Sequence, residues 1–398
     1  MTLETDIKGK ENTHFQVERY GVSVNPEQVS GLSDLVRSAS ASHSGKYVAR
    51  DIEGVLGYLG RFDPSNLSEG RDAAVVKTSF SSSELSYAIK LPEDKRVPYL
   101  VYRFRFNEYP RNKIVSEFPT VLAVEPTSVC NLRCVMCFQA DKTFSSDRAQ
   151  MGYMSMDLYR RIIDESSKHG LPSLILASRG EPLLHKEFPD MVEYAKKKGI
   201  LDIKMNTNAT KLTPDISRRL LAAEPNLIVY SVDSANKEEF ERIRVRADFD
   251  QIVDNIKSFN EIRKKEFPDS KVRTRVSMVV LDGDKGYVQD VAGAKTFWQG
   301  LVDEFAANKV TNRLDLYNLA NSPVDRHCSL LWERMYIWFD GGVNPCDEDY
   351  KSSLLLGKVD ANTSIESIWN GDKMSEYRAK HGKGMKNSMS PCNHCPGF

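Results

Sequence analysis

The stretch EPTSVCNLRCVMCFQ, residues 125–139, carries three cysteines, with three residues in the first gap and two in the second. Cys130, Cys134 and Cys137 are one short of the four ligands that a structural zinc ion takes. Three thiolates on one short loop can instead hold three irons of a four-iron cluster, which leaves the fourth iron open to a small molecule. A zinc or structural site is the alternative, and it needs a fourth ligand that no neighbouring His or Cys supplies.

The overall composition is that of an ordinary globular protein. The 398 residues suffice for about two to three domains, with 40% hydrophobic and 28% charged side chains. The 55 basic and 55 acidic side chains cancel, so no strong field predicts binding to nucleic acid or to a membrane. No apolar run approaches the ~20 residues of a membrane helix, and the amino terminus has no apolar signal core. We therefore expect a cytoplasmic protein, in which cysteines bind metal or react more often than they form disulfides.

Strand and helix patterns alternate from residue 117 onward. Buried strands are predicted at 120–126, 173–178, 201–208, 226–233, 271–280 and 312–320. Helices are predicted between them at 155–170, 188–199, 237–244 and 249–265, and another begins at Thr213-Pro214. This alternation predicts the α/β class, with a parallel sheet covered by helices. Loops at the carboxyl ends of such strands build active sites, and the three cysteines follow the first strand.

Residues 1–116 differ from the rest, because they are rich in Ser and only weakly periodic. We expect loops or linkers at 38–45 and 79–86, and a strand at 98–106. Recurrent Val, Leu, Tyr and Phe predict a small accessory domain of unassigned fold. The expected domains are therefore this accessory region, a central domain at 117–320 and a cysteine-rich segment at 321–398.

The motif Cys130-x3-Cys134-x2-Cys137 after a first strand resembles that of the radical S-adenosylmethionine (radical SAM) superfamily. The resemblance implies a partial (β/α)6 TIM-like barrel and a [4Fe-4S] cluster whose open iron binds S-adenosylmethionine. In that family, one electron cleaves S-adenosylmethionine to a 5′-deoxyadenosyl radical, which takes a hydrogen atom from the substrate. The resemblance also implies an electron donor of the flavodoxin or ferredoxin type.

Other strand ends carry residues that resemble the family's cofactor contacts. SRGEPLLH (178–185) resembles the Gly-Gly-Glu-Pro loop, which assigns such contacts to Arg179, Gly180 and Glu181, although Arg179 stands where Gly is frequent. An ordinary strand-to-helix turn is the alternative. The further positions assigned to the cofactor are Phe138, Asn206, Ser231, Asp233 and Arg244. For these the alternatives are a turn at Asn206, packing of Phe138 on the barrel and a surface arginine at 244.

The remaining four cysteines stand near the carboxyl end, at Cys328, Cys346, Cys392 and Cys395. Four thiolates suit either a tetrahedral zinc or a fully ligated iron–sulfur cluster, and the spacing does not separate these. The spacing from Cys328 to Cys346 and the segment 356–371 resemble the SPASM extension of radical SAM enzymes. A full extension has seven cysteines and two auxiliary clusters. Four cysteines therefore imply the shortened, twitch-like form with one auxiliary [4Fe-4S] cluster.

A cluster with four protein ligands has no open iron, so we expect it to transfer electrons rather than bind substrate. This favours an oxidoreductase of carbohydrate biosynthesis that oxidises an alcohol of a sugar, aminosugar or cyclitol. The radical would remove hydrogen from the carbinol carbon, a base would take the hydroxyl proton, and the auxiliary cluster would accept the electron. The cysteine spacing resembles that of 2-deoxy-scyllo-inosamine dehydrogenase-type enzymes, and other phrases resemble radical enzymes of polysaccharide pathways.

Several alternatives remain at this stage. A radical epimerase needs a hydrogen donor, and all seven cysteines are assigned to clusters, although a tyrosine can also donate. A peptide-modifying maturase would use residues 1–116 to grip a leader. An iron–sulfur or zinc scaffold without activity is the third reading. Candidates for the base are Asp347, Glu348 and Asp349, for which a solvated acidic loop is the alternative.

Overall fold

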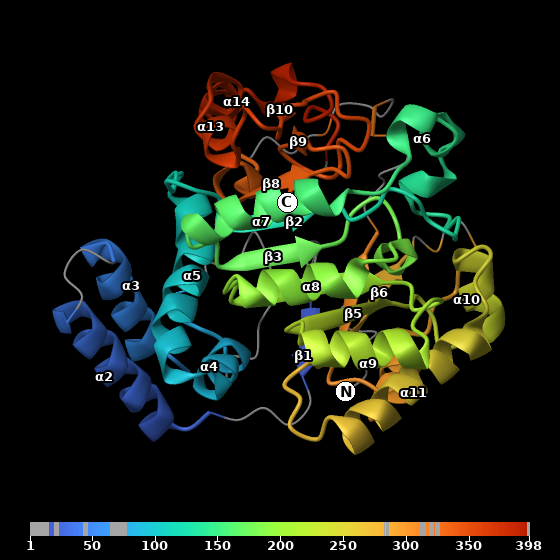
Figure 1. The fold of residues 1–398 in the computed structure, drawn as a ribbon, viewed down its shortest axis with the longest axis horizontal. Coiled ribbons are helices and arrows are strands. Elements are labelled where there is room, and N and C mark those ends of the chain that lie inside the picture. Colours follow the sequence, from blue (N-terminus) through green and yellow to red (C-terminus); the bar gives the residue numbers. More distant parts are fainter. Residues whose placement is uncertain are drawn as a thin grey trace.

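The computed structural model describes the chain with short gaps. The described residues are 16–19, 24–42, 47–63, 78–281, 283, 286–310, 316–317, 322 and 327–395. Within them, one ten-stranded sheet has the order β1-β7-β6-β5-β4-β3-β2-β8-β9-β10 (Figure 1). Hydrogen-bonded strands therefore join the amino-terminal region, the middle of the chain and the cysteine-rich end.

Six neighbouring strands form the parallel centre of this sheet. They are β2 (Val121–Val124), β3 (Ser173–Leu176), β4 (Asp202–Thr207), β5 (Leu227–Ser231), β6 (Arg273–Val280) and β7 (Glu304–Lys309). Each pairs in parallel with the next along the chain, which confirms the predicted α/β class. The first five lie inside the strand ranges predicted from sequence.

The sixth strand lies earlier than the predicted range 312–320, so that prediction was wrong. Leu316 and Tyr317 form a turn, and the rest of the range lies outside the described residues. The observed strand, β7, reads EFAANK. Ala, Asn and Lys are depleted in strands, so the composition of this segment does not predict a strand. Its conformation depends on pairing with β6 along its whole length.

Helices cover the outer face of the parallel strands. They are α7 (Met156–Lys168), α8 (Phe188–Lys197), α9 (Pro214–Ala223), α10 (Lys237–Ile243), α11 (Phe249–Glu266) and α12 (Val291–Trp298). Two side chains cap these helices: Ser155 Oγ accepts from Leu158 N at 3.2 Å, and Thr213 Oγ1 accepts from Ile216 N at 3.3 Å. Figure 1 shows α7, α8 and α9 in succession across the sheet.

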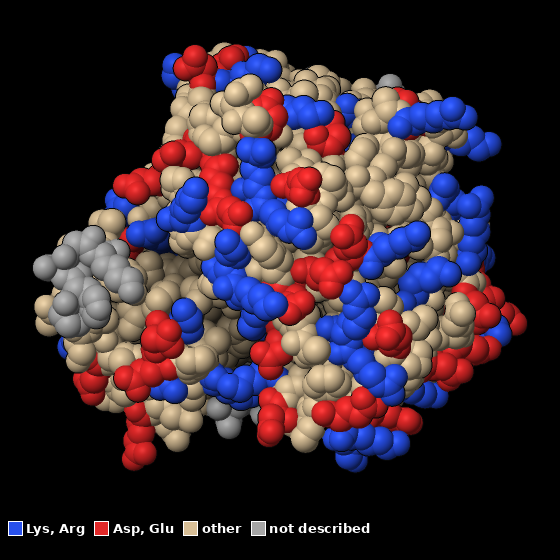
Figure 2. Space-filling model, in the orientation of Figure 1, with Lys and Arg blue, Asp and Glu red and all other residues tan. Residues whose placement is uncertain are grey.

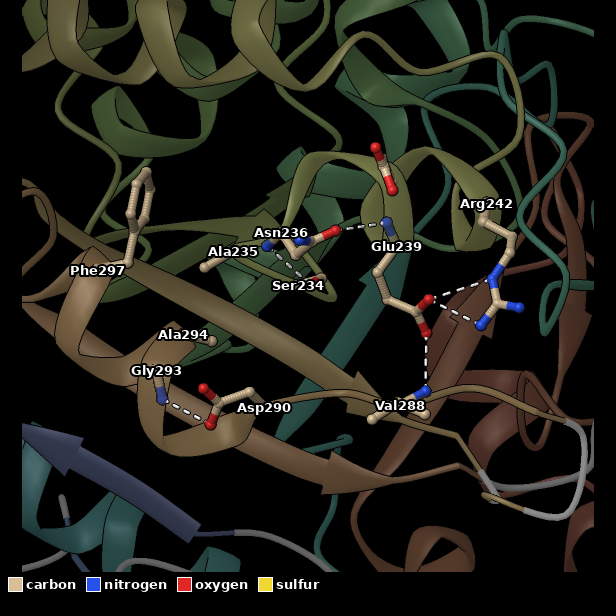
Figure 3. Close-up of a pocket in the computed structure, with 11 residues that line it drawn as sticks. Ser234, Ala235, Asn236, Glu239, Arg242, Val288, Asp290, Gly293, Ala294 and Phe297 are labelled. Atoms are coloured by element: carbon tan, nitrogen blue, oxygen red, sulfur yellow. Dashed lines mark hydrogen bonds and ion pairs between the residues drawn. The ribbon is translucent and has the colours of Figure 1, made fainter.

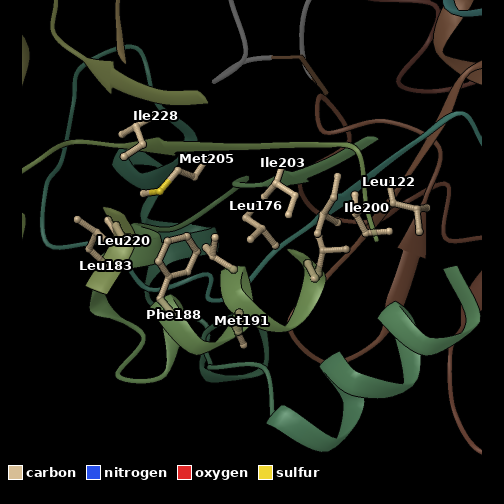
Figure 4. Close-up of a cluster of buried hydrophobic side chains, with 14 of the residues drawn as sticks. Leu122, Leu176, Leu183, Phe188, Met191, Ile200, Ile203, Met205, Leu220 and Ile228 are labelled. Atoms are coloured by element: carbon tan, nitrogen blue, oxygen red, sulfur yellow. The ribbon is translucent and has the colours of Figure 1, made fainter. Parts of the chain in front are cut away.

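The two faces of the parallel strands differ in character. On the outer face, Ile203 and Met205 of β4 are fully buried against apolar side chains of α8 that include Phe188 and Met191 (Figure 4). On the opposite face, which we call the inner face, β4 presents residues 202, 204 and 206, which are only half-buried. A side chain that stays half-buried at the centre of the fold reaches solvent inside it. The inner face is therefore accessible, as a binding site requires.

The amino-terminal region is helical where loops and a strand were predicted. After β1 (Gln16–Arg19) it forms α2 (Pro26–Ser42), α3 (Ala49–Gly60), α4 (Ser82–Lys90) and α5 (Glu93–Arg111). The loop predicted at 79–86 is wrong, because Ser81 and Glu84 form a capping box that starts α4. The loop predicted at 38–45 overlaps the end of α2, and residues 43–46 lie outside the described part.

The strand predicted at 98–106 is wrong, because these residues belong to α5. Val97, Leu100, Val101 and Phe104 are buried together, at the spacing of one helix face. The Val, Tyr and Phe residues of this segment give it a composition that is typical of a strand. Packing against α2, α3 and α4 in a core of their own decides the helical state.

Helices α4 and α5 cover the amino ends of the parallel strands. Asn226, just before β5, donates a hydrogen bond to the Tyr87 hydroxyl of α4. Arg273, the first residue of β6, lies with its guanidinium 4.7 Å from the centre of the same ring. Tyr102 of α5 hydrogen-bonds to Ser173, the first residue of β3. The amino-terminal helices therefore close the end of the sheet opposite the cysteine loop.

The cysteine-rich end continues the sheet beyond β2. Strand β8 (Arg334–Ile337) pairs in parallel with β2, and β9 (Gly342–Asn344) and β10 (Gly357–Lys358) follow in antiparallel order. Helices α13 (Ile365–Trp369) and α14 (Asp372–Gly382) lie over this edge (Figure 1). At the other edge, β1 pairs antiparallel with β7. The sequence pattern did not predict that the sheet continues past residue 320.

The surface agrees with the balanced composition. Figure 2 shows basic and acidic side chains interspersed over the visible face, without a large area of one sign. In the part of the chain that the structure describes, no helix combines the length and the apolar character needed to cross a bilayer.

The outer core predicts a contrast between two phenylalanines. Phe188→Ala removes a fully buried ring and should lower the free energy of unfolding by about 3–5 kcal/mol, measured by urea denaturation. Phe297→Ala is the matched control, because that ring is 40% exposed and its loss should cost roughly a third as much. Equal losses in the two variants would contradict the assigned core.

Candidate functional site

The loop after β2 holds the first three cysteines close together. Cys134 is buried, and Cys130 and Cys137 are half-buried. The pKa values of the Cys130 and Cys134 thiols are raised to about 12, chiefly by burial and in part by the neighbouring thiols, while the charge of Arg244 opposes the rise at Cys134. Three ionisable sulfurs in so little water are unfavourable as free thiolates. A bound cation or cluster removes that penalty, so the group has the chemistry of metal ligands.

Hydrogen-bond donors surround these sulfurs. The donors are Leu132 N at 3.5 Å from Cys130 Sγ, Arg244 Nη1 at 3.8 Å from Cys134 Sγ, and Gln139 N at 3.5 Å from Cys137 Sγ. Such donors stabilise charge on cluster-bound thiolates. Among the described residues, no three His, Cys, Asp or Glu side chains converge tightly enough for a single metal ion. A four-iron cluster does not need such convergence, because each thiolate binds a different iron.

Arg244 is buried beside the trio, so the alternative of a surface arginine is wrong. It caps the end of α10, and its Nε lies 2.7 Å from Asp233 Oδ2. Burial acts to lower the pKa of the guanidinium, but the charges of Asp233 and Cys134 outweigh it and hold the pKa above its ordinary value. Asp233 is held in turn by Val279 N at 2.8 Å. Both assigned residues therefore lie at the cysteine loop, where a carboxylate ligand of a cluster would meet a fixed cation.

Gly180 and Glu181 hold the end of β3 against the cysteine loop. A Cβ atom at Gly180 would lie 2.3 Å from Thr127 O, so only glycine fits this close approach. Glu181 N donates to Val129 O at 2.9 Å. The buried Glu181 carboxylate accepts hydrogen bonds from Thr207 Oγ1 at 2.6 Å and from two backbone N–H groups, of residues 183 and 208. This network ties the ends of β3 and β4 to the loop, which is more than an ordinary turn does.

The Arg179 side chain points away from the trio and towards the cysteine-rich end. Its Nε and Nη2 form a bidentate pair with Glu125, each at 2.8 Å, and both side chains are buried. Its Nη1 donates to Tyr350 O at 3.0 Å, and the guanidinium lies 4.2 Å from the centre of the Trp338 ring. Its carbonyl accepts from Gln139 Nε2 at 2.6 Å. The Arg179 side chain thus contacts Glu125, Trp338 and Tyr350, and its backbone carbonyl contacts the cysteine loop through Gln139.

Phe138 is packed on protein in this structure. Its ring stacks on Tyr350 at a centroid distance of 5.1 Å and meets Phe144 edge-on at 5.8 Å. All three rings are buried in one cluster. The stack connects the cysteine loop with the cysteine-rich end, so the alternative of packing has direct support. A contact with adenine stays a prediction.

Asn206 and Ser231 lie on the inner face near the carboxyl ends of β4 and β5. Both are half-buried. Within the described residues, Asn206 Oδ1 is buried and has no hydrogen-bond partner. An unpartnered acceptor of this kind costs free energy unless a ligand or water satisfies it. The inner face therefore offers a polar position to a bound molecule.

The four later cysteines approach one another from three segments. Cys328 precedes the turn at Ser329–Trp332, Cys346 follows β9, and Cys392 and Cys395 lie in the last described turns. Burial raises the pKa of the Cys328 thiol to about 12, with a further rise from Cys395. Burial raises the pKa of Cys346 well above its ordinary value, and Cys392 and Cys328 add to this. These half-buried cysteines thus lie near one another, which fits the predicted ligand set of one closed cluster.

Cys346 connects this site with the inner face. It packs against Tyr336 and Trp338, which continue the inner face on and beyond β8. Tyr336 is in register with Ala123 of β2. Electrons from a molecule on the inner face would therefore have a short path to the later cysteines.

The three acidic candidates differ in their surroundings, and none belongs to a solvated loop of the kind considered as an alternative. Asp349 is fully buried and accepts from Tyr317 OH at 2.9 Å, Ser353 Oγ at 2.6 Å and Leu354 N at 2.7 Å. Burial raises its pKa, and these bonds oppose the rise. Glu348 is 4% exposed. Asp347 is half-buried, and its charge contributes to the raised pKa values of both the Tyr336 hydroxyl and the Cys346 thiol.

A surface pocket of about 790 Å³ lies outside this site. It is lined by residues of the loop after β5, of α10 and of α12, among them Asn236, Arg242 and Phe297 (Figure 3). Its lining residues begin directly after Asp233. The pocket shares a loop with the candidate site and contributes none of the predicted residues.

Sequence reasoning missed Glu125, Lys204 and the pair Tyr336 and Trp338. Glu125 stands inside the quoted cysteine stretch, but nothing in the sequence marks its partner 54 residues later. Lys204 had a signal, because DIKMNT alternates polar and apolar residues and so places Lys204 and Asn206 on one face. The two aromatic residues had none, because the pairing of β8 with β2 was not predicted.

Comparisons with known proteins agree with the site. Residues 124–285 match the family model described as the radical SAM superfamily, and residues 328–396 match the SPASM iron–sulfur cluster-binding domain. The AdoMet-dependent heme synthase of Methanosarcina barkeri is 34% identical over 160 residues, 40% of this chain and 43% of that protein. The mycofactocin maturase MftC of Mycolicibacterium smegmatis is 27% identical over 179 residues, 44% and 43% of the respective chains. The chain thus spans less than half the length of either relative.

Among solved structures, BtrN in complex with AdoMet and 2-DOIA superposes with a TM-score of 0.50 at 19% identity. The match covers 71% of this chain and 95% of BtrN. This likeness concerns the fold, and it agrees with the predicted partial barrel with a carboxyl-terminal iron–sulfur extension.

The close approach at Gly180 predicts a loss of iron. In Gly180→Ala the new methyl group would push the cysteine loop away from β3, because it meets backbone oxygen rather than a movable side chain. After anaerobic reconstitution we expect iron to fall by about one four-iron cluster per chain. Gly31→Ala is the control, because nothing lies within 4 Å of its added Cβ. Full iron content in Gly180→Ala would contradict this role.

The buried Arg179 pair predicts a large loss of stability. Arg179→Met leaves the Glu125 carboxylate buried without its cation, which should lower the free energy of unfolding by about 3–5 kcal/mol in urea denaturation. Arg218→Met is the matched control. It breaks a bidentate pair with Glu266 that is about half exposed, and should cost about 1 kcal/mol or less. Similar losses in both variants would refute the role of Arg179.

Proposed function

Because residues 124–285 form a radical SAM domain and residues 328–396 form a SPASM domain, we propose that this chain oxidises an alcohol of a sugar, aminosugar or cyclitol. The domains imply a [4Fe-4S] cluster, S-adenosylmethionine and an auxiliary iron–sulfur cluster as cofactors. When bound, these groups supply a 5′-deoxyadenosyl radical that removes one hydrogen atom, and they accept one electron. The proton of the hydroxyl group goes to a base, so the substrate loses two hydrogens in all.

The observation that carries this proposal is the position of the four later cysteines. Their half-buried thiols lie near one another, and Cys346 packs against the cluster of Tyr336 and Trp338 at the inner face. Four protein thiolates leave no ligand position open for substrate. An electron acceptor beside the substrate is what a two-electron oxidation needs, whereas a redox-neutral reaction has no use for it. BtrN, which shares the fold, has a crystal structure in complex with AdoMet and 2-DOIA.

This chain's own residues would bind and position the reactants. Cys130, Cys134 and Cys137 would hold the first cluster, and Arg244 lies beside them as the cation for the cofactor carboxylate. Glu181 keeps the end of β3 in place. Cys328, Cys346, Cys392 and Cys395 would hold the auxiliary cluster. The electron donor proposed for the chain is a flavodoxin or ferredoxin.

Asp347 is the base that the geometry favours among the three acidic residues. It is half-buried and close to Tyr336 and Cys346, at the junction of the inner face and the later cysteines. Asp349 instead uses both its oxygens in hydrogen bonds that shape the loop. A base must reach the substrate hydroxyl, and only an accessible carboxylate can do so.

A second candidate is a peptide-modifying maturase or a radical epimerase. The similarity to the maturase MftC over 179 residues favours the former. Among the seven cysteines, an epimerase would lack a thiol outside the two groups. Product mass and hydrogen exchange with solvent distinguish these reactions from oxidation.

The oxidation proposal predicts a defined mass change. The reconstituted chain, with S-adenosylmethionine and a reductant, is given a panel of cyclitols and aminosugars that includes 2-DOIA. We expect one product two hydrogens lighter, formed with one 5′-deoxyadenosine per molecule. In Cys346→Ala, 5′-deoxyadenosine should still form while product falls by about tenfold or more, because the electron lacks its acceptor.

Cys134→Ala is the control for the radical itself, and it should abolish cleavage of S-adenosylmethionine. Epimerisation would give a product of unchanged mass in ordinary water and a product with one solvent deuterium in heavy water. That result would overturn the proposal. Full product formation by Cys346→Ala would overturn the role of the auxiliary site.

A further inference from the structure

The inner face carries positive charge that its own carboxylates do not balance evenly. Arg273 and Arg275 share the single carboxylate of Glu304, with Arg273 Nη1 at 2.5 Å from Oε1 and Arg275 Nε at 2.6 Å from Oε2. Arg334 is paired with the adjacent Glu333, at 2.6 Å from its Nε. Two carboxylates thus serve three guanidinium groups. A further carboxylate, that of Asp202, lies on the same face of β4 as Lys204.

Lys204 adds a fourth cation to this group. It is half-buried on the inner face of β4, and within the described residues it has neither a hydrogen bond nor an ion pair. The pKa of its amine is lowered to about 8, chiefly by burial and in part by the charges of Arg275 and Arg334, against smaller opposing effects of Asp202 and Glu304. An enclosed ammonium group between two arginines is unfavourable unless an anion joins them.

Lys204 also has a defined place relative to the two groups of cysteines. It is in register with Ile175 of β3, which is in register with Ala123 of β2, and Ala123 is in register with Tyr336 of β8. Tyr336 packs on Cys346. Towards the carboxyl end of β4, the next inner residue is Asn206, whose Oδ1 has no partner among the described residues. An anion at Lys204 would therefore leave the rest of its molecule facing Asn206 and the first three cysteines.

We propose that the inner face binds an oxyanion of the substrate, a phosphate or a carboxylate, with Lys204 as its anchor between Arg275 and Arg334. This rests on the proposed function in taking the inner face as the substrate site, and it narrows the substrate to a sugar or cyclitol that carries a negative group. Arginine forks and an ammonium group bind such oxygens by charge-assisted hydrogen bonds. The polar remainder of the substrate would meet Asn206 and Ser231.

Chemical labelling of lysines tests the anchor without knowledge of the substrate. The full, reconstituted chain is treated with acetic anhydride at pH 8, and acetylation is read for each lysine by peptide mass spectrometry. Inorganic phosphate, acetate and chloride are added in separate samples at equal ionic strength. We expect saturating phosphate or acetate to slow acetylation of Lys204 by about tenfold, and chloride to leave it unchanged. The better protector of the two identifies the oxyanion.

Lys196 serves as the matched control inside the same samples. It is also half-buried, its pKa is also lowered by burial, and its Nζ donates to Glu224 O at 3.1 Å on the outer side of the molecule. Its acetylation should be the same with every salt. Equal protection of Lys204 and Lys196, equal protection by chloride, or a Lys204 that no reagent reaches would each overturn the proposal.

A variant gives a second, independent readout. The protecting anion should raise the thermal midpoint of the wild-type chain and of Lys196→Met, but not of Lys204→Met. An undiminished rise in Lys204→Met would also refute the anchor. These experiments measure binding alone, so an absence of oxidation with intact anion binding would count against the proposed reaction and not against the anchor.

Discussion

The bidentate contact between Arg179 and Glu125 holds the rest of the site together. Glu125 follows β2 and Arg179 follows β3, so their contact joins the carboxyl ends of two neighbouring strands. The same guanidinium reaches Tyr350 and the Trp338 ring of the cysteine-rich end. A buried ion pair stabilises the fold only when its donors and acceptors have partners. Here the Glu125 carboxylate and the Tyr350 carbonyl accept from the Arg179 guanidinium, which also lies against the Trp338 ring. The relative position of the two cysteine groups depends on this contact.

The inner face of the parallel strands is where the separate parts of the molecule meet. The first three cysteines lie at its carboxyl end, Tyr336 and Cys346 lie at the β2 side, and α4 and α5 close the amino end. The amino-terminal helices therefore shape one end of the inner face, although none of the predicted site residues lies in them. In the proposed function, a molecule on the inner face would lie between these helices and the loop of the first three cysteines.

The sequence predicted the centre of the fold better than its borders. Five strands were found because each has either an apolar run, as in VLAV at β2, or apolar residues at alternate positions, as in DIKMNT at β4. EFAANK at β7 was missed because pairing with β6, and not its own composition, determines its strand conformation. The strand assigned at 98–106 failed because Tyr, Phe and Val favour strands in isolation, whereas burial of Val97, Leu100 and Phe104 decides for a helix. Cysteine spacing located both sulfur sites, but spacing carries no information on Glu125, whose partner lies far along the chain.

The pairing of β8 with β2 has a consequence for how the chain folds during synthesis. Strand β2 is made early, yet the neighbour that covers its free side arrives roughly 210 residues later. At about 5–20 residues per second, that edge of the sheet waits on the order of 10–40 s for its partner. An uncovered parallel edge is a template for wrong pairing with another chain. Strands β8 to β10 thus complete the sheet beside the first cysteines, so neither sulfur site can reach its final form before these strands have been synthesised.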